Sequence, residues 1–137
     1  MSLLKDKVAI VTGGNGGIGL GISEGLAHEG AKVIIAARNE EKNKDAIKKI
    51  KLSSKDSETF KLDVNDQDSI NSLIKFAIEK YGKIDILINN AGINRRSDEP
   101  HLLAKSDWDD VIDTNLNSIH HMTSTVFPYL KKNKSGK

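Results

Sequence analysis

The residues with the clearest chemical meaning are the glycines between Thr12 and Gly19. The stretch Thr12-Gly13-Gly14-Asn15-Gly16-Gly17-Ile18-Gly19 follows a short apolar run, Val8–Val11, and leads into a helical pattern with apolar residues four apart. Glycines let the main chain approach a pyrophosphate closely, and the unpaired N–H groups at a helix start attract the anion. Strand, glycine-rich turn and helix in this order predict a dinucleotide-binding site.

Two glycine registers overlap in this stretch. Gly14, Gly16 and Gly19 match the bare G-x-G-x-x-G pattern, whereas Gly13, Gly17 and Gly19 match T-G-x-x-x-G-x-G. A tight turn with a purely structural role would also explain the bare pattern. A P-loop is disfavoured, because no Gly-Lys-Ser/Thr follows the glycines.

Polar residues also follow the other apolar runs of the chain. Asp63-Val64 comes after one run, Asn89-Asn90-Ala91-Gly92 closes another, and Arg38 comes after a third. Ligands of open α/β sheets bind at the carboxyl ends of the strands, beside the point where the strand order reverses. We therefore expect these residues to share one crevice with the glycine loop.

Strand and helix patterns alternate along the chain, which is typical of a parallel α/β sheet. Strands are predicted at Val8–Val11, Lys32–Ala36, Glu58–Leu62 and Ile84–Asn89. Helices are predicted from the glycine loop to Gly30, over Asn39–Leu52, from the capping pair Asn65 and Asp68 to Gly82, and from the capping box of Ser106 and Asp109 to about Tyr129. Right-handed crossovers then predict a doubly wound parallel sheet, a Rossmann fold, with strand order 3-2-1-4.

The last predicted helix carries an apolar stripe that we expect to face the core. Pro128 should kink or end this helix. The stripe consists of Trp108, Val111, Ile112, Asn115, Leu116, Ile119 and Val126. Asn115 is the polar member, and a buried amide costs free energy unless it is hydrogen-bonded.

Composition limits the kind of protein. The 137 residues are enough for about one domain, and the net charge of +2 is too small to favour nucleic acid. The chain has no cysteine, which excludes disulfides and a thiolate nucleophile. No apolar run is long enough to span a membrane, and no metal-ligand spacing is visible. A reducing cytoplasm is the expected location.

Taken together, the motifs resemble the short-chain dehydrogenase/reductase family. Thr12–Gly19, Asp63-Val64, Asn89–Gly92 and Asn115 follow the family's order and spacing, and the resemblance covers roughly residues 5 to 134. It implies hydride transfer between a nicotinamide cofactor and a small molecule with a hydroxyl or carbonyl group.

The resemblance also implies roles for single residues. Gly13, Asn15, Gly16, Gly17, Ile18 and Gly19 would hold the pyrophosphate and the adenosine ribose, Asp63 and Val64 the adenine, and Asn90 and Gly92 the ribose on the nicotinamide side. In the family, the asparagine matching Asn115 helps a lysine hold a water in a proton relay. Structural alternatives stay open for two of them: Asp63 as a helix N-terminal acid and Asn115 as a helix-bending core amide. For Asn89, we predict a buried amide that ties strands together.

Cofactor choice follows from the end of the second predicted strand. Enzymes that use NAD usually place an acid there for the ribose 2′-hydroxyl, whereas this chain has Ala36, Ala37 and then Arg38. An arginine can bind a 2′-phosphate through two N–H groups of its planar guanidinium. NADP(H) is therefore favoured, and NAD(H) stays possible. A solvated Arg38 is the alternative. Gly16 weakens the case, since NADP-using relatives often carry a basic residue there.

The loop after the fourth predicted strand contains Arg95 and Arg96, which could pair with a substrate carboxylate. This segment is similar to enzymes that act on gluconate-type sugar acids, such as 2-deoxy-gluconate 3-dehydrogenases. A solvated charge pair is the alternative.

One part of the family pattern is missing. Catalysis there needs a tyrosine with a lysine four residues later, but Tyr129 is followed by Asn133 and Tyr81 by Asp85. We therefore expect residues 1–137 to be the front half of a longer single domain, inactive alone and a dimer or tetramer when intact. A non-catalytic nicotinamide-nucleotide-binding module is the alternative. A methyltransferase on a similar fold is disfavoured, because its ribose-binding acid is missing.

Overall fold

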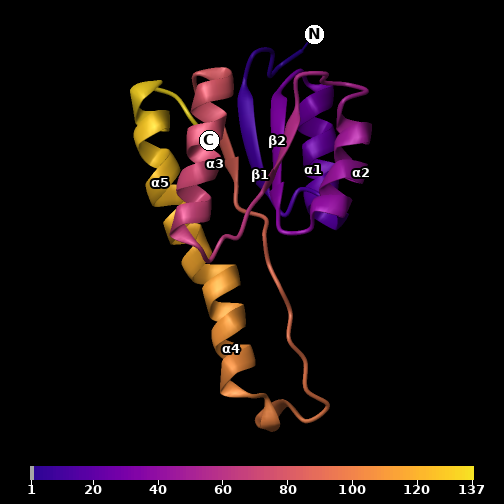
Figure 1. Cartoon of the computed structure of the whole chain (residues 1–137), viewed down its shortest axis with the longest axis vertical. Helices are drawn as coiled ribbons and strands as arrows, with labels where there is room; N and C mark the ends of the chain where they lie inside the picture. Colours follow the sequence, from indigo (N-terminus) through magenta and orange to yellow (C-terminus); the bar gives the residue numbers. More distant parts are fainter. Residues whose placement is uncertain (1) are drawn as a thin grey trace.

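The computed structural model describes residues 2–137 as one parallel four-stranded sheet with helices on both faces (Figure 1). The strands are β1 (Val8–Thr12), β2 (Lys32–Ala37), β3 (Glu58–Lys61) and β4 (Ile86–Ile88). The helices are α1 (Gly17–His28), α2 (Glu40–Ile50), α3 (Gln67–Tyr81), a 3-10 turn η1 (Pro100–Leu102), α4 (Lys105–Ile112), a π turn η2 (Asp113–Asn117) and α5 (Ser118–Lys132). The order β3-β2-β1-β4 confirms the predicted α/β doubly wound sheet.

The sheet separates two apolar layers. Side chains of β1 and β2 alternate between them, so both strands read as continuous apolar runs. Ile10 and Ile34 face α3 and α5, while Val11 and Ile35 face α1 and α2. Because both faces are covered, the centre of the sheet is buried.

Most helix ends lie within a residue or two of their predicted positions. Gly30 and Gly82 have positive φ angles, +91° and +75°, after the ends of α1 and α3. Asn39 caps α2, as its side chain accepts the N–H of Lys42. The cap of α3 is Asp66 rather than Asn65, and it accepts the N–H of Asp68 at 3.0 Å.

The last helical segment differs from the single capped helix that was predicted. It begins at Lys105 after Ala104, which provides no side-chain cap, so the capping box of Ser106 and Asp109 is wrong. The π turn η2 interrupts it, and α5 continues through the exposed Pro128 to Lys132. A proline is tolerated here because solvent can satisfy the carbonyl left without its helical partner.

The apolar stripe predicted for this segment is also wrong, except at Val126, which is buried. Trp108 is 58% exposed and Leu116 60% exposed, and Asn115 is exposed as well. The inward face instead consists of Thr114, Ser118, Met122 and Val126. The reason is visible in Figure 1: α4 extends beyond the sheet, so its apolar side chains have no sheet to pack against.

The outer edge of β4 is partly occupied by the end of the chain. The N–H of Leu87 donates to the carbonyl of Lys137 at 3.0 Å, and the N–H of Lys137 donates to the carbonyl of Asp85 at 3.1 Å. This is the bonding pattern of a parallel ladder. Among residues 2–137, no helix is both long and apolar enough to cross a membrane.

Candidate nucleotide-binding cleft

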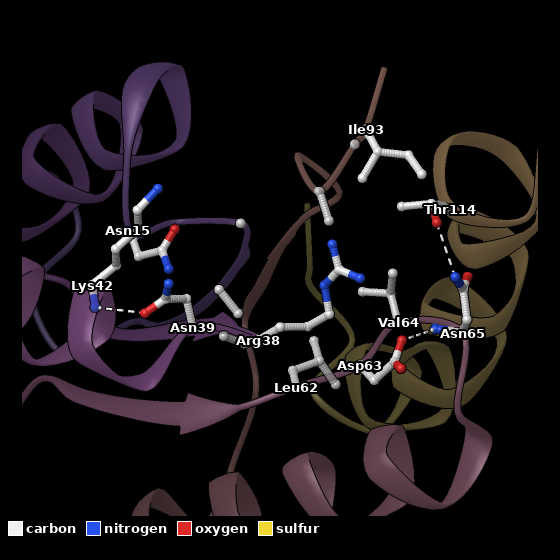
Figure 2. A pocket seen from close by; sticks show the side chains of 15 residues that line it. Asn15, Arg38, Asn39, Lys42, Leu62, Asp63, Val64, Asn65, Ile93 and Thr114 are labelled. Atoms are coloured by element: carbon white, nitrogen blue, oxygen red, sulfur yellow. Dashed lines mark hydrogen bonds between the residues drawn. The ribbon is translucent and has the colours of Figure 1, made fainter. Parts of the chain in front are cut away.

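A cleft of about 310 Å³ opens at the carboxyl ends of the strands (Figure 2). It is lined by Gly13, Asn15, Ala36, Ala37, Arg38, Asn39, Lys42, Leu62, Asp63, Val64, Asn65, Ala91, Gly92, Ile93 and Thr114. Segments that follow all four strands therefore meet there, as the topology predicted. The sequence analysis did not predict four of the polar lining residues, because each lies outside the recognised motifs. They are Asn39, Lys42, Asn65 and Thr114.

The glycine loop shows which register the backbone needs. Gly13 and Gly17 have positive φ angles of +63° and +51°, a region that disfavours side chains. A Cβ on Gly19 would lie 2.3 Å from Asn90 Nδ2 and from the Gly13 carbonyl oxygen. Gly16 has neither constraint, so the geometry favours the T-G-x-x-x-G-x-G register.

The start of α1 fits a bound pyrophosphate. Cβ atoms added at Gly16 and Gly17 would meet nothing within 4 Å, so the space before the helix is open. The first helical bond runs from the N–H of Leu20 to the carbonyl of Gly16. The N–H groups of residues 17–19 therefore have no partner within residues 2–137. Open space, free donors and the helix dipole together suit an anion. Ile18 lies at this rim and is 80% exposed.

Asn90 locks the glycine loop to the end of β4. Its Nδ2 donates to the carbonyls of Thr12 at 3.0 Å and Gly13 at 3.1 Å. The Thr12 hydroxyl accepts the N–H groups of Asn90 and Ala91, both at 3.0 Å. Both amide protons of Asn90 are thus used internally, which leaves its Oδ1 for a ligand.

The predicted strand-tying role of Asn89 is therefore wrong, and Asn90 has it instead. Asn89 is exposed, and its amide donates to the Thr123 hydroxyl of α5 at 3.2 Å. The reason is the alternation of side chains along a strand, which turns neighbouring residues to opposite faces.

The end of β2 presents no acid to the cleft. Ala36 is buried, Ala37 is half-buried, and the exposed Arg38 points into the cleft (Figure 2). Within residues 2–137, Arg38 forms no ion pair. Nearby, Asn15 Nδ2 donates to Asn43 Oδ1 at 2.9 Å, which ties the glycine loop to α2.

The end of β3 forms the opposite wall. Val64 is buried there, and Asp63 Oδ1 accepts the N–H of Asn65 at 2.9 Å. Asn65 Nδ2 donates to the Thr114 hydroxyl at 2.9 Å. This bond connects the wall of the cleft with the π turn that carries Asn115.

Asn115 is not the buried core amide that the stripe suggested. Its Oδ1 accepts the N–H of Ile93 at 2.7 Å, and its Nδ2 donates to the carbonyl of Ile93 at 2.9 Å. The amide is satisfied by the loop after β4 rather than by the core. Asn115 therefore fixes the backbone next to Gly92, and π turns of this kind are frequent at functional sites.

The two arginines of the long loop lie outside the cleft lining. Arg95 is already paired, with Nε 3.7 Å from Asp107 and a guanidinium nitrogen 3.6 Å from Asp110. Arg96 is exposed.

Neither tyrosine lies at the cleft. Burial and the charges of Glu58 and Asp56 raise the pKa of Tyr81, whose hydroxyl donates to the Asp56 carbonyl at the amino end of the sheet. Tyr129 lies against α3 and does not line the cleft. In the part of the chain from residue 2 onward, no three His, Asp or Glu side chains gather as a metal-binding group.

Fold and cleft define a doubly wound α/β domain with a cleft at the carboxyl ends of its strands. Residues 7–137 match the family model described as short chain dehydrogenase. The chain is 40% identical to a 3-oxoacyl-(acyl-carrier-protein) reductase FabG of Chlamydia muridarum, over 98% of this chain and 54% of that protein. It is 36% identical to the short-chain dehydrogenase anuI of Penicillium roqueforti, over 98% of this chain and 54% of that protein. The chain thus spans about half the length of these relatives.

Solved structures of short-chain dehydrogenases have the same fold as this chain. A short chain dehydrogenase from Bacillus anthracis matches with a TM-score of 0.90 and 35% identity, over 96% of this chain and 54% of that one. A 3-ketoacyl-(acyl-carrier-protein) reductase from Brucella melitensis, complexed with NADH, matches with a TM-score of 0.87 and 29% identity, over 95% and 52%. This chain belongs to the short-chain dehydrogenase family of oxidoreductases.

Proposed function

We propose that the chain forms the nucleotide-binding part of an oxidoreductase that prefers NADP(H) and acts on a small hydroxyl or carbonyl compound. The observation that carries the cofactor preference is the end of β2. Two alanines stand where an acid would repel a 2′-phosphate, and Arg38 enters the cleft without an ion-pair partner in residues 2–137.

Each part of the cleft has a task in this proposal. The nicotinamide cofactor supplies the hydride chemistry when bound. The N–H groups of Gly17–Gly19 bind the pyrophosphate, with Gly13, Asn15, Gly16 and Ile18 shaping the same loop. Asp63 and Val64 receive the adenine, while the Asn90 Oδ1 and the backbone at Gly92 face the second ribose. Asn115 holds that backbone in place and serves the proton relay.

The substrate proposal has two versions. A sugar acid would use Arg96, since Arg95 is paired with Asp107 and Asp110. A 3-oxoacyl thioester is favoured by the names of two relatives, the reductases of Chlamydia muridarum and Brucella melitensis. Assays with both compound classes on the intact enzyme separate the two versions.

Assembly and location are further parts of the proposal. Trp108, Leu116, Ile119 and Phe127 leave an exposed apolar face on the last helical segment, which supports self-association into a dimer or tetramer. A cytoplasmic location stays a prediction, which fractionation of the tagged protein would check.

The alternative is a nicotinamide-nucleotide-binding module without catalysis. No tyrosine of this sequence has a lysine four residues later, so the 137 residues alone should bind nucleotide without turning over substrate. A gene that continues into such a pair supports the enzyme, and a gene that does not supports the module.

Titration calorimetry tests the cofactor preference. NADPH should bind more tightly than NADH, and Arg38→Ala should cost about 1.5–3 kcal/mol of NADPH binding, the range for hydrogen bonds to charged groups. NADH affinity should change little. Equal losses for both cofactors would reject the 2′-phosphate role of Arg38.

A further inference from the structure

The first turn of α2 carries a second cation at the cleft. Lys42 lines the cleft together with Arg38 and Asn39. Figure 2 shows Lys42 on the same side of the cleft as Asn15, while Arg38 points into its middle. The Asn39 side chain accepts the N–H of Lys42 at 3.0 Å, which fixes the helix start from which Lys42 extends.

The acidic residues next to Lys42 already form ion pairs with other lysines. Glu41 pairs with Lys44 at 2.9 Å, and Glu40 pairs with Lys61 at 3.2 Å. Across residues 2–137, no carboxylate comes within ion-pair distance of Lys42 or Arg38. This rim of the cleft therefore keeps two uncompensated positive charges.

The glycine loop supplies no cation of its own on this side. Gly16 precedes α1 in an extended conformation, with a φ angle of −168°, and a Cβ there would meet nothing within 4 Å. The bond from Asn15 to Asn43 holds this loop against α2. A side chain from the first turn of α2 can therefore reach the space in front of Gly16.

We infer that Lys42 is the second contact for a phosphate monoester on the adenosine ribose, opposite Arg38. The inference rests on the proposed function and names the residue that completes its cofactor specificity. Arg38 provides a planar fork of donors, while Lys42 provides a compact charge on a flexible stem. Two cations favour a dianionic phosphate, and a ribose that carries only a hydroxyl gains much less from them.

Titration calorimetry with 2′,5′-ADP and 5′-ADP tests this inference without any need for turnover. Lys42→Met should weaken 2′,5′-ADP about tenfold, near the lower end for a hydrogen bond to a charged group. The affinity for 5′-ADP should stay within about twofold, because it lacks the second phosphate. Lys44→Met is the matched control, since Lys44 lies on the same helix but pairs with Glu41. It should change neither affinity.

A rescue variant makes the test specific to charge and place. Gly16→Arg in the Lys42→Met background should recover most of the affinity for 2′,5′-ADP, because the loop has room for a side chain there. Equal losses for both ligands, an unchanged affinity for 2′,5′-ADP, or no recovery in the double variant would each overturn the role of Lys42. Failure of the unmodified chain to bind either ligand would instead reject the proposed function.

Discussion

Asp85 and Glu58 at the amino end of the sheet have charged partners within the chain, whereas Arg38 and Lys42 at the carboxyl end have none in residues 2–137. Before β4, Asp85 accepts the N–H of Val8 at 2.9 Å and lies 3.2 Å from the Lys83 ammonium. At the start of β3, Glu58 lies 2.9 Å from Lys80 and 3.4 Å from Lys51.

The carboxyl end of the sheet differs in which groups are paired. Within residues 2–137, the N–H groups at the start of α1 and the side chains of Arg38 and Lys42 have no internal partner, while Gly13, Gly19 and Asn90 are closely packed by neighbours. The unpaired groups can therefore bind a ligand, and the closely packed residues hold them in position. The comparison shows that charged side chains at one end of the sheet are paired within the chain, while the other end has the unpaired donors and cations on which the proposed anion site depends.

The largest expected effect is at Gly19. Gly19→Ala should destabilise the fold by about 3 kcal/mol, the upper part of the overpacking range, and abolish nucleotide binding. The added Cβ would lie 2.3 Å from both Asn90 Nδ2 and the Gly13 carbonyl oxygen. Thermal unfolding and calorimetry measure the two effects.

Gly25→Ala is the matched control for Gly19→Ala. Gly25 lies in the same helix, and a Cβ there would meet nothing within 4 Å. The change should stabilise the helix by up to about 1 kcal/mol. Normal nucleotide binding by Gly19→Ala would contradict the assignment of the loop.

Asp85 tests the amino end. Asp85→Asn should cost about 2 kcal/mol of stability, because the N–H of Val8 loses a charged acceptor in a buried position. Nucleotide affinity, measured at a temperature where the variant is folded, should not change. A loss of nucleotide affinity in the folded variant would contradict the separation of stability at the amino end from binding at the carboxyl end.

Asn115 links stability and binding at the cleft. Asn115→Ala removes both bonds to Ile93 and should cost about 1 kcal/mol of stability, since the exposed backbone can turn to water instead. Binding of the nicotinamide half of the cofactor should be weakened most. The affinity for NADPH should therefore fall, while the affinity for 5′-ADP should not change. Equal losses for the two ligands would show that Asn115 acts only through the overall fold.

The smallest effect is the pH dependence of Glu58. Burial raises its pKa, but hydrogen bonds and charges from Lys80 and Lys51 outweigh burial, so the pKa lies below the usual 4.5. Its stabilisation is complete above about pH 4.5 and is lost as the pH falls through the lowered pKa.

Glu58→Gln should therefore be less stable than the unmodified chain at neutral pH, and the difference should shrink as the pH falls below about 4.5 and through the lowered pKa. Chemical denaturation at a series of pH values measures it. A difference that grows in acid would contradict this ion-pair role.

The sheet order could be predicted because alternating periodicities and crossover handedness leave few topologies. The convergence of Gly13, Asp63 and Gly92 followed from that order. The outer face of the last helical segment could not be predicted, because apolar spacing does not reveal that α4 extends beyond the sheet. Met122 lies outside the predicted stripe, yet it is fully buried.

Sequence alone determined the strands and the carboxylate-free end of β2, since each depends on residue types within one short segment, while the φ angles and close contacts of the loop chose between the two glycine registers. Tertiary structure decided which side chains are free and which are used. Asn90 is bound to β1, Arg95 to α4 and Asn115 to the loop after β4, whereas Lys42 is free to reach the cleft. The physical reason is that hydrogen bonds and ion pairs form between segments far apart in the chain, and local patterns do not encode those pairings.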